Sequence, residues 1–117
     1  IPLRLVGSEM CIRDRGNYIP EIYGVANALI VMGVTDDGAR LAWEGRLAAV
    51  REGCEVIVTT LSREGQLSQR LSPPEATDVL CAHLSVETWW YLRDRRGWSQ
   101  TRYVEAMQQT LKTMLLA

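Results

Sequence analysis

The clearest structural signal in this chain is a helix start at Ser72-Pro73-Pro74-Glu75. The Ser72 hydroxyl can accept a hydrogen bond from the backbone N–H of Glu75, while the Glu75 carboxylate can accept one from the backbone N–H of Ser72. Proline at the first helical position loses no donor that the helix needs. The segment therefore predicts a helix that begins at residue 73, and it argues against a strand at this point in the chain.

The segments upstream of this start also have helical patterns. Apolar residues cover most of the circumference of residues 18–32, which predicts a first helix buried on several sides and ended by Gly33 as a left-handed cap. A second helix is predicted from Thr35 or Asp36 to about Ser62, since either side chain can accept from free backbone N–H groups. Its predicted buried face carries Trp43, Leu47, Val50, Cys54, Ile57, Val58 and Leu61 at steps of three and four.

Helical patterns continue downstream of residue 73. Ser85 is predicted to restart the helix after a bend, Gly97 to close it, and Ser99 to cap a last amphipathic helix. Residues 56–61 would qualify as a strand on propensity alone, but no strand is predicted. The sequence therefore predicts an all-α fold, an antiparallel helical bundle.

Residues 1–15 differ in kind from the rest of the chain. The string Val6-Gly7-Ser8-Glu9-Met10-Cys11-Ile12-Arg13-Asp14-Arg15 resembles a translated sequencing adapter, and Arg4-Leu5 fit the same reading frame. A genuine N-terminal strand or arm is the alternative, since the apolar residues 1–6 would permit one. We interpret residues 1–15 as adapter-derived and residues 16–117 as the domain, with the native N-terminus missing.

The charge of residues 16–117 argues against direct binding to nucleic acid. Without the first fifteen residues the chain has ten basic and twelve acidic residues, a net charge near −2. Domains that bind nucleic acid gain most of their affinity by neutralising phosphates with a clustered basic surface. No such cluster occurs in the sequence, and we expect no tight binding of this chain to duplex DNA.

The cysteines and the apolar stretches indicate where such a domain resides. Cys54 and Cys81 lack metal-ligand spacing, which predicts buried thiols in a reducing compartment. The longest apolar stretch, residues 22–32, is only about half as long as a membrane span. We expect a cytoplasmic domain without a cofactor, a metal or a membrane-spanning segment.

An ordered set of features links the second half of the chain to a known family. They are Gly65-Gln66-Leu67, Leu71-Ser72-Pro73-Pro74-Glu75-Ala76, Val86-Glu87-Thr88-Trp89, Arg96-Gly97-Trp98-Ser99 and Tyr103. In this order the stretch 65–116 resembles the C-terminal part of TetR-family transcriptional regulators. The likeness covers about half of the chain directly, and the family's N-terminal DNA-reading helix-turn-helix is absent.

The resemblance implies an effector-sensing and dimerisation domain that would contact DNA only through the missing N-terminal unit. Its last helices would pair with their copies across a two-fold axis as a four-helix dimer interface. We expect that interface to contain Val79, Leu80, His83, Leu84, Tyr103, Met107, Leu111 and Leu115. Tyr23, Met32, Trp43, Leu47, Val50 and Cys54 are the residues expected to line a pocket for a small apolar or aromatic effector, with ordinary core packing as the alternative.

Catalysis is not expected, because His83 is the only histidine and lacks a nucleophile and an orienting partner. Asp36 and Asp37 are better explained by a helix N-terminus than by a paired-carboxylate site. The tryptophans at 89, 90 and 98 could stack on bases, but without a basic groove they favour core or interface packing. A free-standing helical interaction module that senses no ligand remains the alternative function.

Overall fold

The computed structural model describes residues 19–20 and 23–117, so the prediction made for residues 1–15 lies outside it. The regular structure of the described residues is helical. It comprises a helical stretch over residues 23–32 and the elements α2 (Asp37–Arg63), α3 (Pro73–His83), α4 (Val86–Trp90), the π-helix η1 (Tyr91–Arg95) and α5 (Gln100–Leu115). Within the described part, extended pairing is limited to one isolated bridge between Leu67 and Leu116. The all-α prediction is confirmed.

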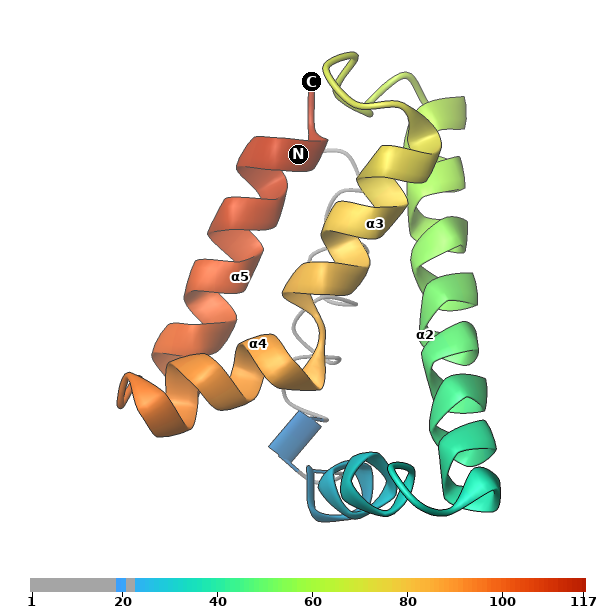
Figure 1. Cartoon of the computed structure of the whole chain (residues 1–117). Coiled ribbons are helices and arrows are strands. Elements are labelled where there is room, and N and C mark those ends of the chain that lie inside the picture. Colours follow the sequence, from blue (N-terminus) through green and yellow to red (C-terminus); the bar gives the residue numbers. More distant parts are fainter. Residues whose placement is uncertain (1–18, 21–22) are drawn as a thin grey trace.

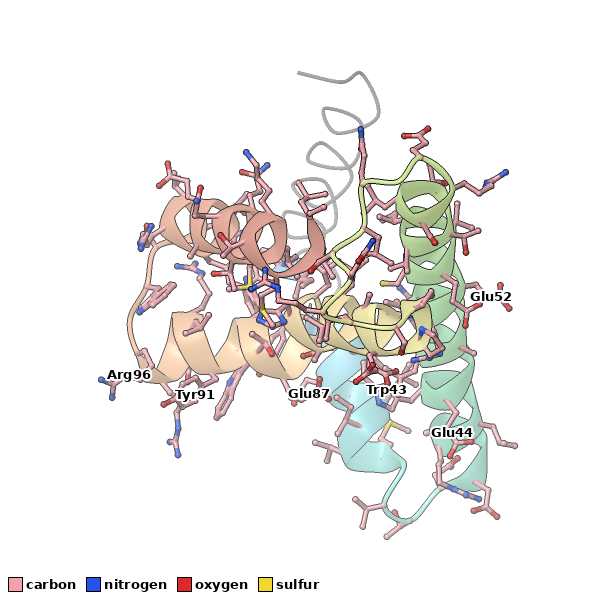
Figure 2. All side chains as sticks on the ribbon, turned by 90° about the horizontal axis from the view of Figure 1, so that it is seen from above. Trp43, Glu44, Glu52, Glu87, Tyr91 and Arg96 are labelled. Carbon is pink, nitrogen blue, oxygen red and sulfur yellow. The ribbon has the colours of Figure 1, made fainter. Side chains whose placement is uncertain are left out.

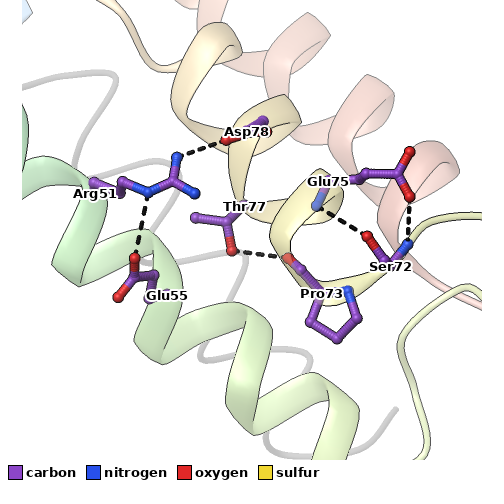
Figure 3. A network of polar contacts seen from close by, with 7 residues as sticks. All are labelled: Arg51, Glu55, Ser72, Pro73, Glu75, Thr77 and Asp78. Carbon is purple, nitrogen blue, oxygen red and sulfur yellow. Dashed lines mark hydrogen bonds and ion pairs between the residues drawn. The ribbon is translucent and has the colours of Figure 1, made fainter.

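The helix starts follow the predicted capping chemistry. Ser72 accepts from the backbone N–H of Glu75 at 3.3 Å and donates its own backbone N–H to the Glu75 carboxylate at 3.0 Å, so the capping box is complete (Figure 3). The other N-caps are Asp36, which accepts from the backbone N–H of Ala39, together with Ser85 and Ser99. These side chains satisfy backbone donors that a helix start leaves without partners.

The glycines at helix ends behave in two different ways. Gly97 has a φ of 72°, the left-handed conformation predicted for it. Gly33 does not adopt a positive φ, so its prediction as a left-handed cap is wrong. A Cβ at Gly33 would lie 3.0 Å from the carbonyl oxygen of Leu29 and 3.2 Å from the Cα of Arg40, so close backbone approach is the structural need for glycine there.

The three longest helices run side by side in alternating directions (Figure 1). α2 is followed by α3 in the opposite direction and α5 reverses again, while α4 crosses beneath α3 and α5. Arg51 of α2 donates to the Asp78 carboxylate of α3 at 2.6 Å and pairs with Glu55 at 3.3 Å (Figure 3). The antiparallel bundle is therefore present within a single chain.

The side chains between these helices form two buried clusters. The first, termed the aliphatic core, joins α2, α3 and α5 through Cys54, Val58, Ala76, Leu80, Leu84, Leu111 and Leu115. The second, termed the aromatic core, joins the stretch 23–32 to α4 and α5. Its buried members are Ile19, Ala26, Val86, Trp89, Tyr103, Val104, Ala106 and Met107, with Tyr23, Trp43, Trp90, Leu92 and Trp98 packed against them.

The stretch 23–32 is covered on one side only. Ala26 is buried, whereas Val25, Val31 and Met32 are exposed. The prediction of a helix buried on several sides is therefore wrong for the single chain, because α4 and α5 cover one face and the rest faces outward. Among the described residues, no helix has the length and apolar character needed to cross a membrane.

Candidate functional site

An open hollow lies between the stretch 23–32 and the α4–η1 segment. It has a volume of about 590 Å³, within the roughly 300–1,000 Å³ of small-molecule sites. Its lining residues come from these two segments and are Tyr23, Asn27, Ile30, Val86, Glu87, Trp90 and Tyr91. The lining combines three aromatic rings and two aliphatic side chains with one amide and one carboxylate, which is the composition of a site that orients an apolar ligand by a few polar contacts.

The local structure of α4 and η1 places three of these side chains together. Ser85 accepts from the backbone N–H of Thr88 at 3.2 Å and so sets where α4 begins. Glu87, Trp90 and Tyr91 then follow at spacings of three and four residues, which puts them on one helix face. Glu87 and Tyr91 project from the same side of this segment (Figure 2).

Aromatic contacts hold the two walls of the hollow against each other. The rings of Tyr23 and Trp89 lie with centroids 5.0 Å apart and planes tilted by 51°, within the range of favourable aromatic pairs. The indole N–H of Trp89 donates to the Gln100 side chain at 2.8 Å, which fixes that ring against α5. The wall that carries Glu87 and Trp90 is therefore anchored to the core behind it.

Among the described residues of the lining, Glu87 is the only charged one. Its carboxylate forms no hydrogen bond or ion pair with any residue that the structure describes, and it is exposed. At this wall, the guanidinium carbon of Arg95 lies 5.4 Å from the centroid of the Trp90 ring. The described residues of the hollow thus combine one carboxylate with aromatic walls.

The predicted pocket residues do not gather in one place. Tyr23 lines the hollow, and Trp43 packs against the aromatic core. Cys54 is buried in the aliphatic core, and Val50 packs against it. These two residues therefore fit the alternative of ordinary core packing. Met32 and Leu47 are exposed.

The predicted dimer-interface residues are mostly buried within the single chain. Leu80, Leu84, Leu111 and Leu115 belong to the aliphatic core, and Tyr103 and Met107 to the aromatic core. Val79 and His83 are partly exposed. A second copy would therefore find little free surface at the six buried positions, and the dimer interface itself stays a prediction.

The single histidine has a local structural role. His83 Nδ1 lies 2.8 Å from the carbonyl oxygen of Val79, one helical turn earlier. The Asp36 carboxylate caps α2, as predicted. In the described part of the chain, no three His, Cys, Asp or Glu side chains are grouped closely enough to hold a metal ion.

Sequence reasoning missed most of the hollow. Asn27, Ile30, Val86, Glu87, Trp90 and Tyr91 were not predicted as ligand-binding residues, because α2 was expected to supply the second wall. The Glu87, Trp90, Tyr91 spacing was visible in the sequence as an aromatic face with one carboxylate. Which helix faced it was a property of the tertiary arrangement.

The comparisons with known proteins add no relative. Neither protein-family models, nor curated proteins, nor solved structures give a match to this chain.

Proposed function

We propose that this chain is the effector-sensing and dimerisation domain of a TetR-type transcriptional regulator, with no catalytic activity of its own. The observation that carries the proposal is the aromatic hollow between the stretch 23–32 and α4–η1. Further support comes from the order of helix starts at Ser72, Ser85 and Ser99, each of which coincides with a feature of the family-like stretch 65–116.

The position of the hollow suits a sensor. One wall is the stretch 23–32, which packs on one side only, and the other is anchored to the core through Trp89. A ligand that bridges the two walls would favour conformations in which they are close. It could change DNA affinity only through its differential binding to the two states, and such couplings are typically about 1–3 kcal/mol.

The ligand-binding part of the proposal is tested by a thermal-shift screen of small aromatic molecules on the purified chain. A ligand present at a hundred times its Kd stabilises the folded state by about 2.7 kcal/mol, a rise in Tm of roughly 10 °C for a domain of this size. The rise should be reduced in a Tyr91→Ala variant and retained in a Val56→Ala variant, since Val56 is exposed on α2 outside the hollow. If no compound raises Tm, the hollow is not a ligand site.

The regulatory part is tested on the native gene. Its upstream sequence should encode a helix-turn-helix within about 50–100 residues, a span set by ordinary domain sizes. The whole protein should bind a two-fold symmetric operator and release it with the compound found in the screen. Light scattering should give twice the 13.2 kDa of the chain, and a monomer at high micromolar concentration would contradict dimerisation.

A helical interaction module is the second candidate, and one observation favours it. The outer face of α2 exposes Leu41 and Val56, with the small residues Gly45, Ala49 and Gly53 also exposed on that helix. Exposed apolar side chains on a long helix suit contact with another protein. Leu41→Asp should abolish association if α2 forms the contact, and should leave association unchanged if the proposed C-terminal interface forms it.

A further inference from the structure

We propose that the hollow between the stretch 23–32 and α4–η1 binds an organic cation, with Glu87 as its counter-ion and the rings of Tyr23, Trp90 and Tyr91 as its walls. This inference depends on the proposed ligand-sensing function and specifies the chemical class of the ligand. It is based on the charge and ring content of the lining residues.

The charge of the lining selects the sign of the ligand. Glu87 supplies a carboxylate, and the described residues of the lining include no basic side chain. None of the described residues pairs with this carboxylate, so a ligand cation would displace none of them. An anion placed in the hollow would be repelled by the Glu87 carboxylate. At close range this repulsion persists even in a high dielectric.

The rings select the form of the cation. An aromatic face attracts a positive group within about 6 Å of its centroid, and large, weakly hydrated ammonium groups suit this contact best. The guanidinium of Arg95 already lies 5.4 Å from the centroid of the Trp90 ring, so this ring accepts contact with a cationic group. Three rings and two aliphatic side chains in about 590 Å³ favour an alkylated or aromatic ammonium over a small inorganic ion.

Arg95 lies beside this wall, and it should affect the affinity for a ligand cation. Its side chain contacts Trp90 but does not line the hollow. Removing it in Arg95→Ala withdraws a competing cation from the ring. Affinity for a ligand cation should therefore rise about twofold, and a fall would show that Arg95 assists binding and would overturn this description of the site.

The experiment compares three probes of one shape and different charge by NMR titration of the isotopically labelled chain. They are phenyltrimethylammonium, the neutral dimethylphenylcarbinol and the anionic α,α-dimethylphenylacetate. The cation should bind tightest and shift the amide signals of residues 23–30 and 86–91. Glu87→Gln should weaken its binding on the order of fivefold, and Tyr91→Leu about threefold.

Glu52→Gln is the matched control. It removes the same charge from an exposed position on α2, away from the lining residues (Figure 2). Its affinity for the cation should equal that of the unchanged chain. Both Glu87 and Tyr91 are exposed, so their variants should fold, which circular dichroism checks.

The outcomes separate the two proposals. Equal binding of the cation and the neutral probe, with no effect of Glu87→Gln, would refute the cation proposal while leaving the hollow as a ligand site. Shifts elsewhere in the chain, or no binding by any probe, would overturn the cation proposal together with the proposed sensing function.

Discussion

Replacing Tyr103 by phenylalanine should stabilise the fold, the reverse of the usual effect of losing a buried tyrosine hydroxyl. Tyr103 is fully buried in the aromatic core. Its hydroxyl oxygen is buried and has no hydrogen-bond partner among the described residues. A buried polar group left unsatisfied costs about 1–3 kcal/mol, so Tyr103→Phe should raise the free energy of unfolding by about 1 kcal/mol at neutral pH.

The burial of Tyr103 also predicts how the free energy of unfolding changes with pH. Burial raises the pKa of the Tyr103 phenol from 10.0 to about 12. Between these values the unfolded chain loses the phenolic proton while the folded chain keeps it, so stability falls as pH rises. At pH 11 this loss is about 1.4 kcal/mol, and it approaches 2.7 kcal/mol as the pH passes 12.

Urea denaturation followed by tryptophan fluorescence measures both effects. The free energies of unfolding of the unchanged chain and of Tyr103→Phe should differ by about 1 kcal/mol at pH 8 and by about 2.4 kcal/mol at pH 11, in favour of the variant. Other groups that titrate in this range are common to both proteins and cancel in the difference. A variant less stable at pH 8, with a difference that does not grow by pH 11, would show that the hydroxyl is hydrogen-bonded or reaches solvent.

Further predictions concern the helix start, the aliphatic core and the close contact at Gly33. Ser72→Ala should lower stability by about 1 kcal/mol. It should move the pKa of Glu75 only part of the way back towards 4.5, as an NMR titration would show, because the backbone N–H of residue 72, which lowers this pKa most, remains and only the side-chain hydrogen bond is lost. Leu80→Ala should cost about 2–5 kcal/mol in urea denaturation, because Leu80 is fully buried; a loss below 1 kcal/mol would contradict its place in the core. Gly33→Ala should lower Tm, since its Cβ would meet the Leu29 carbonyl oxygen at 3.0 Å, whereas Gly45→Ala, with open space around it, should raise Tm slightly.

Helix positions were predictable from the sequence because their signals are local. The capping box at Ser72, the restart at Ser85 and the left-handed Gly97 each depend on atoms a few residues apart. Gly33 shows the limit of such reasoning. A Cβ there would meet the Leu29 carbonyl oxygen and also the Cα of Arg40 on the next helix, and this second contact is one that a local pattern does not reveal.

The hollow was only partly predictable for the same reason. Tyr23 lines it, but the other pocket residues were expected mainly on α2, where Leu47 is exposed and Cys54 belongs to the aliphatic core. An apolar stripe at helical spacing predicts that this face of the helix will be buried, but it does not indicate which other helix will bury it. The stretch 23–32 in fact packs against α4 and α5.

The amino-acid sequence by itself determined that the chain is helical, where its helices begin after residue 35, and which side chains are apolar enough to be buried. The tertiary structure alone decided that Leu80, Tyr103 and Leu111 are covered within one chain, and that Glu87 and Trp90 meet Tyr23 across a hollow. The physical reason is the distance along the chain over which each kind of interaction acts. Backbone hydrogen bonds and caps act over a few residues, whereas burial depends on which distant faces pack together, and hydrophobic attraction has no direction that a sequence pattern could specify.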